Sequence, residues 1–340
     1  MKKSILIAFA LFPSFFGFVS CSKTEDGTGN GNESVLHVSI LPQTKASGAG
    51  HGVQSDDNLV KTLEIFIFRA EGNDAGALDT YKKFAEEDLT SLSDLPVNTT
   101  TGLKHIYAVA NSHRENWNGV QSLSQFKEVC ARLQSENLKD FTMTGSVEAM
   151  LQSSTSVTFA VSRLVARVEL SSIKTSFAGT PYQGTLLENV KVYLTNVISE
   201  RFYADGGLPE GVAILNSKMA VAGDINGCAM SGMLYEQIMQ KIGATAHAIP
   251  HYFYCYPNEV EDETDETRFT KLVIQADLNG NTYYYPIPLE NIERNSAYSL
   301  SVNIMRPGTL DPEQPLEKGV LDVTLNVLDW ELHPQTDVEF

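Results

Sequence analysis

Hydrophobic and polar residues alternate in short runs along most of the chain, and turn-forming residues separate the runs. The first run covers residues 35–41 and predicts a strand, because its side chains alternate with a period of two. Its two sets are Leu36, Val38 and Ile40 against Val35, His37, Ser39 and Leu41. Further strands are predicted at residues 63–68, 105–110, 157–161, 164–170, 190–194, 251–256, 272–278, 282–287, 298–304 and 320–327. Many short strands with few helices predict an all-β protein made of sandwich-like domains.

Two local signals refine this pattern. Asn279-Gly280-Asn281 separates the runs at 272–278 and 282–287, and it predicts a tight hairpin because Asn and Gly tolerate positive φ angles. Residues 122–133 instead show a helical period, with Ser122 or Ser124 as a candidate N-cap. The apolar face of this predicted helix comprises Leu123, Phe126, Val129, Cys130 and Leu133.

The strand runs fall into two groups, which predicts an N-terminal domain at residues 35–170 and a C-terminal domain at 171–340. The stretch that follows the first strand, residues 42–58, is polar and rich in glycine, so we expect an exposed loop. Residues 21–34 are rich in Gly, Asn and acidic side chains, which is typical of a flexible tether.

The N-terminus predicts an export signal over residues 1–20. Lys2 and Lys3 precede an apolar run from residue 5 to residue 19, which is shorter than the roughly 20 residues that span a bilayer. Ser20 is a small residue directly before Cys21, which is the pattern that a lipoprotein signal peptidase accepts, although Phe18 replaces the usual Leu. We therefore expect Cys21 to become a lipidated N-terminus; an ordinary secretory signal that is cleaved elsewhere is the alternative.

Charge and cysteine content narrow the possible partners. The chain carries a net charge of −17, and removal of residues 1–20 leaves 23 basic against 42 acidic residues, a net charge of −19. Such a surface repels nucleic acid and anionic lipid, so we expect neither as a partner. Besides Cys21, the mature chain holds only Cys130, Cys228 and Cys255, without a CxxC or Cys/His cluster, so a disulfide framework and a zinc site are both unexpected.

No pattern in the sequence indicates catalysis. The motifs of serine hydrolases, metalloproteases and nucleotide-binding enzymes are absent, so we expect no catalytic residue, no cofactor and no metal. His247 and His251 are four residues apart, but Pro250 lies between them and argues against a shared helix face. The acidic run at residues 259–266 lacks the ligand pattern of an EF-hand, so we expect a solvated loop.

Clustered aromatic residues leave one binding function open. Such side chains could stack on a sugar, which would make the protein a surface glycan-binding lipoprotein. In a strand, however, half of these side chains face the core. The cluster comprises Tyr252, Phe253, Tyr254, Tyr256 and Tyr283, Tyr284 and Tyr285.

Two further features call for an explanation. Lys45 and Ala46 lie in the polar loop after the first strand, where small neighbouring residues would present a basic residue to a trypsin-like protease; any surface loop, however, contains a lysine. The C-terminal residues 331–340 remain partly apolar to the last position, so this segment either pairs within its own sheet or pairs with another molecule.

Together these features resemble the FimA-type fimbrillins of Bacteroidetes, the subunits of type V pili. The resemblance covers essentially the whole mature chain and depends on the order and spacing of several short segments. They are the lipoprotein signal ending at Cys21, the strand at 63–68 with its Glu-Gly turn, and residues 106–111, 143–145, 163–168, 253–258, 294–298 and 329–330.

The resemblance implies a fold and a mechanism. The fold would be all-β, with two sandwich-like (transthyretin-like) domains and minor helices. The subunit would reach the outer membrane as a lipoprotein, and a trypsin-like or arginine-specific protease would then cut between Lys45 and Ala46. The cut would release the strand within residues 35–45, and a strand of a neighbouring subunit would fill the groove that it leaves. The donor would be the C-terminal segment that contains Trp330, Leu332, Val338 and Phe340.

The implied partners are other copies of the chain or related fimbrial subunits, the protease, and the outer membrane through the lipid. The implied location is the cell surface and the fimbrium. The family usually has arginine at the cut, so Lys45 is a departure that leaves an uncut anchor subunit as an alternative to a polymerising one.

Overall fold

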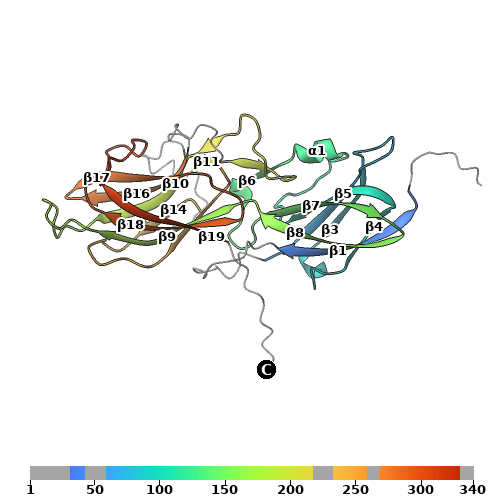
Figure 1. Cartoon of the computed structure of the whole chain (residues 1–340), viewed down its shortest axis with the longest axis horizontal. Coiled ribbons are helices and arrows are strands. Elements are labelled where there is room, and N and C mark those ends of the chain that lie inside the picture. The colour runs from blue at the N-terminus through green and yellow to red at the C-terminus, as the bar shows by residue number, and fades with distance from the viewer. Residues whose placement is uncertain (1–30, 43–58, 217–232, 259–268, 330–340) are drawn as a thin grey trace, which may run out of the picture.

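The computed structural model describes residues 31–42, 59–216, 233–258 and 269–329, and these form two β-sandwiches arranged along the long axis of the molecule (Figure 1). Both the all-β class and the two-sandwich architecture expected from the sequence are confirmed. The β-rich alternating runs explain this outcome, because each strand has one apolar face that must be buried against another layer.

The first sandwich uses seven strands in the order β3-β2-β5-β7-β8-β1-β4. One layer contains β3 (Leu78–Phe84), β2 (Leu63–Arg69), β5 (Gly102–Ala110) and β7 (Met143–Leu151). The other contains β8 (Ser154–Arg163), β1 (Glu33–Pro42) and β4 (Leu95–Thr100).

The two layers of this sandwich join where β7 meets β8. These strands pair only through Met143 with Arg163 and Thr144 with Ser162, and then they separate. A side chain at Gly145 would overlap the backbone carbonyl of Ala160, so glycine permits the close approach from which the layers diverge. A core of buried apolar side chains from both layers fills the space between them.

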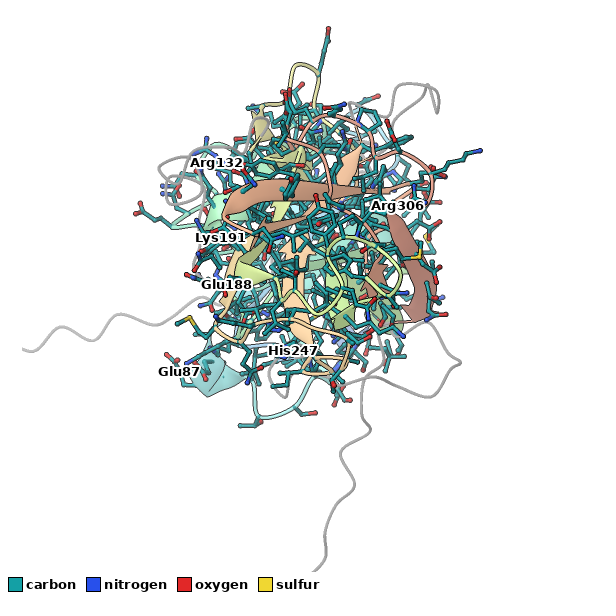
Figure 2. All side chains as sticks on the ribbon, turned by 90° about the vertical axis from the view of Figure 1, so that its left-hand side faces the viewer. Glu87, Arg132, Glu188, Lys191, His247 and Arg306 are labelled. Carbon is teal, nitrogen blue, oxygen red and sulfur yellow. The ribbon has the colours of Figure 1, made fainter. Side chains whose placement is uncertain are left out.

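The second sandwich has two four-stranded layers. One is β14 (Tyr235–Ile238), β10 (Glu188–Thr195), β16 (Thr270–Leu278) and β17 (Asn281–Leu289). The other is β15 (His251–Cys255), β9 (Ala166–Thr175), β18 (Ser296–Ile304) and β19 (Leu321–Asp329). Figure 2 looks along the molecule with this sandwich toward the viewer. Buried apolar side chains of both layers form its core.

Short elements complete the described part of the chain. They are α1 (Leu123–Lys127), β6 (Cys130–Arg132), β11 (Val197–Ile198), β12 (Glu200–Phe202), β13 (Ile214–Leu215) and 3-10 turns at Glu86–Asp88 and Leu133–Ser135. The pair β6–β12 links a segment of the first half of the chain to one of the second half.

The two sandwiches contact each other through buried polar groups. The Arg294 guanidinium donates to the carbonyl of Arg163 at 3.0 Å and to Thr144 Oγ1 at 3.0 Å, so it sits where β7 and β8 diverge. Tyr256 of the second sandwich donates to Glu136 Oε1 at 2.7 Å, and burial raises the pKa of Glu136. These contacts fix the first sandwich against the second.

Most of the predicted strands are confirmed within a few residues, and so is the hairpin. Asn279 and Gly280 have φ angles of 51° and 79°, as a tight two-residue turn requires, and they connect β16 to β17. The strands β3, β4 and β7 carry weak or broken apolar alternation and were not expected. Since β9 pairs with β15 and β18, the chain enters the second set of sheets between Arg163 and Ala166; the limits 35–170 and 171–340 stay predictions.

The helix predicted at residues 122–133 is wrong in its extent. The helix α1 ends at Lys127, although its predicted cap is present, since Ser122 Oγ accepts from the Gln125 N–H at 3.3 Å. Residues Cys130–Arg132 form β6 instead, because they pair with β12 some seventy residues further along the chain. A non-local strand pairing therefore overrides the local helical period.

Candidate strand-exchange groove

Strand β1 is the middle strand of the three-stranded layer β8-β1-β4. It pairs antiparallel with β4, from Glu33 opposite Thr100 to Val38 opposite Leu95. On its other side it pairs parallel with β8, from Val35 opposite Ser154 to Pro42 opposite Val161. Removing β1 would therefore leave an open groove with a sheet edge on each side, which we call the β1 groove.

The side chains of β1 explain why it occupies this position. Leu36, Val38 and Ile40 point inward and are at most 2% exposed, which confirms the alternation read from the sequence and shows which set faces the core. They pack in the core of the first sandwich with apolar residues of the facing layer, among them Ile65 and Ile106. The floor of the β1 groove is thus apolar along its length.

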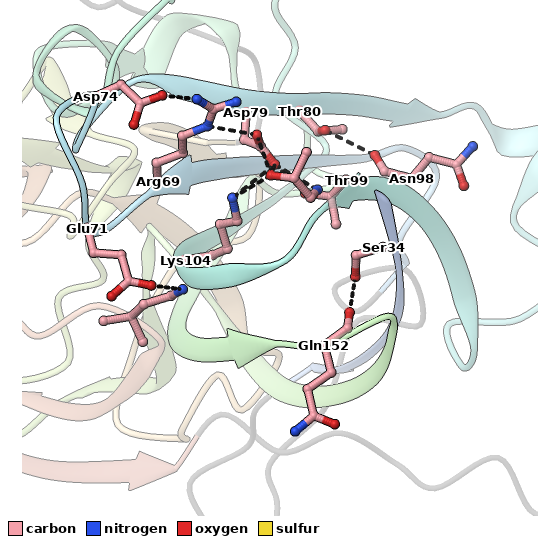
Figure 3. Close-up of polar contacts among 12 residues, drawn as sticks. Ser34, Arg69, Glu71, Asp74, Asp79, Thr80, Asn98, Thr99, Lys104 and Gln152 are labelled. Carbon is pink, nitrogen blue, oxygen red and sulfur yellow. Dashed lines mark hydrogen bonds and ion pairs between the residues drawn. The ribbon is translucent and has the colours of Figure 1, made fainter. Parts of the chain in front are cut away.

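Polar contacts hold the ends of β1. Ser34 Oγ donates to the Gln152 carbonyl next to β8, and the Ile40 N–H donates to the Leu92 carbonyl at 2.8 Å (Figure 3 shows the first of these). The exposed His37 Nδ1 lies 2.8 Å from Asp94 Oδ1. None of these contacts is covalent, so β1 is held by pairing, burial and a few hydrogen bonds.

The connection of β1 to the rest of the fold is also distinctive. A parallel neighbour cannot be joined to it by a short hairpin, and β1 reaches the next strand, β2, only through residues 43–62. A break in that connection would leave no peptide link between β1 and the strands that follow. The middle strand of a layer would then be bound only by non-covalent contacts.

The residues that the sequence assigns to lipidation, cleavage and donation lie outside the described part of the chain. They are Cys21, Lys45, Ala46, Trp330, Leu332, Val338 and Phe340. The segments beside them are described: β1 ends at Pro42, shortly before Lys45, and β19 ends at Asp329, directly before Trp330. Leu325 and Val327 of β19 are 43% and 64% exposed, so the strand that leads to Trp330 carries uncovered apolar side chains.

The two histidines do meet, although not on a helix. His247 Nε2 and His251 Nε2 are 3.0 Å apart, and His251 Nδ1 lies 2.9 Å from Glu236 Oε2 of β14. Burial and the neighbouring His251 lower the pKa of His247. In the described ranges no group of three or more His, Cys, Asp or Glu side chains has a metal-binding arrangement. Glu236 could not be predicted as a neighbour of these histidines, because it belongs to the separate strand β14.

The aromatic cluster belongs mainly to the core. Tyr254, Tyr256 and Tyr285 are buried with Phe253, while Tyr252, Tyr283 and Tyr284 are half-buried. Burial raises the pKa of Tyr284, which packs with Tyr193 and Val273 on the sheet. Each of these seven rings is therefore at least half-buried. The acidic run at residues 259–266 lies outside the described part of the chain.

A polar crevice of about 690 Å³ lies beside the contact between the sandwiches. Arg114 stacks on the Trp117 ring at 4.7 Å there, and Arg132 pairs with Glu200 at 3.1 Å, so its cations are already engaged. Burial raises the pKa of the Cys130 thiol, which has no disulfide partner, and the buried Cys255 has none either. Over the described residues, no helix is long and apolar enough to cross a membrane.

Comparisons with known proteins agree with this architecture. The family model of the major fimbrial subunit protein (FimA) matches residues 35–191, from β1 into β10. The chain is 26% identical over 333 residues to the major fimbrium subunit FimC of Porphyromonas gingivalis, with 92% of this chain and 67% of that protein covered. It is 22% identical to the putative fimbrium tip subunit Fim1C of Parabacteroides distasonis, with 78% and 73% covered.

Solved structures show the same fold. A putative cell adhesion protein from Bacteroides eggerthii superposes with a TM-score of 0.66 at 20% identity, covering 89% of this chain and 98% of that one. A fimbrilin from Porphyromonas gingivalis superposes with a TM-score of 0.63 at 17% identity, covering 88% and 99%.

Proposed function

Because the chain belongs to the FimA-type family of fimbrial subunits, we propose that it polymerises into a fimbrium by exchanging β1 for a strand of a neighbouring subunit. The observation that carries this proposal is the place of β1, the middle strand of its layer with a parallel neighbour. Such a subunit acts in adhesion through assembly and not through catalysis.

The energetics of the β1 groove suit an exchange. An exposed groove leaves the backbone groups of β4 and β8 unpaired and uncovers the apolar floor beneath Leu36, Val38 and Ile40. Refilling it buries three large side chains, each worth roughly 1.5–3 kcal/mol before the entropy cost of ordering the strand. A strand that supplies alternating apolar side chains and a backbone ladder on both sides would bind tightly and dissociate slowly.

The donor would be the C-terminal segment that follows β19. Trp330, Leu332, Val338 and Phe340 would supply its apolar side chains, and the exposed Leu325 and Val327 support this, because the approach to the segment is already uncovered. Because the donor segment and the β1 groove are different parts of the chain, the contact between subunits is head to tail. Such contacts do not close and therefore form a fibre.

Export and activation would come before assembly. We propose that Cys21 is lipidated and delivers the precursor to the outer membrane, and that a trypsin-like protease then cuts between Lys45 and Ala46. The cut falls within the connection from β1 to β2, so β1 becomes a separate peptide. The lipid leaves with it, since Cys21 and β1 are on the same side of the cut.

Limited proteolysis of the full-length chain tests this proposal. A trypsin-like protease should convert the chain into ladders of multimers on native gels, and Lys45→Ala should prevent this conversion. Lys139→Ala, which changes an exposed lysine in another loop of the same sandwich, is the matched control and should polymerise normally. Deletion of residues 331–340 should abolish multimers while leaving the cleavage intact. Normal polymerisation of Lys45→Ala would refute activation at this site.

An uncut anchor subunit is the second candidate, favoured by the lysine at the position where the family usually has arginine. An anchor would keep Cys21 and β1 and would use only its C-terminal segment. In the proteolysis experiment it would end a fibre of another subunit and would form no ladder alone.

A further inference from the structure

If β1 is exchanged, β4 must stay in place without its ladder partner. This strand is the last of its sheet, and in the described ladders it pairs with β1 alone. If β1 leaves, β4 loses its only ladder partner, whereas β8 remains joined to β7 through two residue pairs. A groove without a fixed β4 would have only one wall for an incoming strand.

A buried charged cluster connects β4 to the opposite layer (Figure 3). Asp79 of β3 has a side chain that is 1% exposed, and it accepts from Thr99 Oγ1 at 2.6 Å and from the Thr100 N–H at 3.0 Å. The Arg69 Nε of β2 donates to it at 3.0 Å, and the Lys104 Nζ of β5 lies 3.3 Å away. Four strands of the two layers thus meet at one carboxylate.

The cluster is built to keep this carboxylate charged. Burial alone would raise the pKa of Asp79, but hydrogen bonds from Thr99, Thr100 and Arg69 outweigh it and hold the pKa well below its ordinary value. Lys104 Nζ also donates to Thr100 Oγ1 at 2.8 Å, so the same cation touches both Asp79 and β4. Charged hydrogen bonds of this kind are among the stronger polar contacts in proteins.

None of the groups bound to Asp79 belongs to β1. The Thr100 N–H is directed to the carboxylate and not to Glu33, its opposite residue in the ladder. Thr80 Oγ1 of β3 also donates a hydrogen bond to the Asn98 carbonyl of β4 at 3.0 Å, and this bond does not involve β1. The whole attachment of β4 to β3 therefore survives the departure of β1.

We propose that Asp79 is a positioning residue for strand exchange, which holds β4 against β3 when β1 has left and so keeps the β1 groove open for the incoming strand. This inference rests on the proposed exchange of β1. The attachment is at the Thr99–Thr100 end of β4, opposite the start of β1. At the other end, the Asp94 N–H donates to Ser39 Oγ of β1, a contact that is lost with β1, and Leu95 packs in the apolar core. In the empty groove, β4 is therefore fixed at one end and loosens first at the other.

The test uses the complete chain with a site-specific protease sequence inserted after Lys45, so that nicking does not depend on the natural cut. A fluorescent peptide of residues 33–42 reports uptake into the β1 groove, and hydrogen exchange read by mass spectrometry reports the amides of β1 and β4. The test variant is Thr99→Val, which removes one bond to Asp79 but leaves Arg69 and Lys104 in place. Thr142→Val, an equally buried threonine of the same sandwich without contact to β4, is the control.

In the unsubstituted nicked chain, β4 amides should exchange more slowly than β1 amides, with the greatest protection near Thr100. Thr99→Val should shorten this lag and weaken peptide uptake about tenfold, the effect of losing one hydrogen bond to a charged group. Thr80→Val should show the same change in smaller size, which keeps the test informative if Thr99→Val folds poorly. Thr142→Val should behave like the unsubstituted chain.

Two failures are distinguishable. Equal uptake and an equal lag in Thr99→Val and Thr142→Val would overturn the role of Asp79 and leave strand exchange standing. Failure of the peptide to enter the unsubstituted nicked chain at all would overturn the exchange of β1 and, with it, this inference.

Discussion

The first strand of each sandwich occupies the same place in its layer. Strand β1 lies between an antiparallel neighbour, β4, and a parallel one, β8, while β9 lies between the antiparallel β15 and the parallel β18. Figure 1 shows the two strands in the separate halves of the molecule. By pairing alone, either strand could be the one that is exchanged.

The strands β1 and β9 differ in their covalent connections and in their burial. Strand β9 follows β8 after only two residues and continues through described residues to β10, so both of its ends are covalently joined to neighbouring strands of the fold. Its residues 166–170 are all buried, on both faces. Strand β1 joins the following fold only through residues 43–62, and its outward side chains are partly exposed. The position of a strand in its layer therefore determines which strands it pairs with, whereas its covalent connections determine whether it can dissociate.

A buried charge placed beneath each strand should have the largest effect. Leu36 of β1 and Leu170 of β9 are both 0% exposed. An aspartate in such a site costs several kcal/mol, comparable with the stability of a domain. We expect Leu170→Asp to unfold the second sandwich, whereas Leu36→Asp should expel β1 and leave the remaining strands folded.

Hydrogen exchange read by mass spectrometry separates these outcomes. Leu36→Asp should lose protection in β1 and keep it in β2, β5 and all of the second sandwich. If Leu36→Asp lost protection throughout the first sandwich, β1 would be as integral to its fold as β9 is.

A smaller change measures how firmly β1 is bound. Leu36→Ala should lower the free energy of unfolding of the first sandwich by about 2–5 kcal/mol, because it removes buried side-chain volume from the core. Leu41→Ala changes the same strand on its outward side, where Leu41 is 57% exposed, and should cost less than about 0.5 kcal/mol. Urea unfolding of both variants gives the two values, and similar losses would mean that the apolar floor does not hold β1.

Acid should also distinguish the two sandwiches, by a smaller change in stability than the substitutions above. A carboxyl whose pKa is lower in the folded state contributes stability above its unfolded value, and this contribution is lost as the pH falls. Asp79 of the first sandwich has such a lowered pKa in a buried site, while Asp277 of the second has a lowered pKa because of bonds from Asn189 and Thr282 in a half-exposed one. Below about pH 4, we therefore expect the first sandwich to lose more stability through its carboxylate than the second.

Thermal unfolding between pH 2 and pH 6 checks this expectation. Asp79→Asn should flatten the pH dependence of the first transition, and Asp277→Asn should change the second much less because solvent already screens it. Equal flattening in both variants would show that Asp79 contributes no more to the pH dependence of stability than Asp277 does.

Local patterns in the sequence were enough to predict much of the fold. The alternation of residues 35–41 predicted β1, and Asn279-Gly280 predicted the hairpin, because both depend on neighbouring residues. The helix from residue 122 was predicted too long, since Cys130–Arg132 is a strand only through its distant partner β12. The sequence could also not show which neighbours flank β1.

The candidate site was predictable only in part. The alternation of β1 is a local signal that predicted the strand, whereas the structure was needed to show that Leu36, Val38 and Ile40 are the inward set. The cluster around Asp79 carries none, because its members lie on four strands and look individually like ordinary polar residues of strands. His247 and His251 were noted for their spacing, yet their contact depends on an irregular backbone path and on Glu236 from another strand.

N-terminal sequencing of subunits extracted from assembled surface fibres tests the central claim, that β1 leaves its layer on assembly. We expect these subunits to begin at Ala46 and to lack residues 33–42. Fibres built from subunits that retain a lipidated Cys21 together with β1 would contradict this claim.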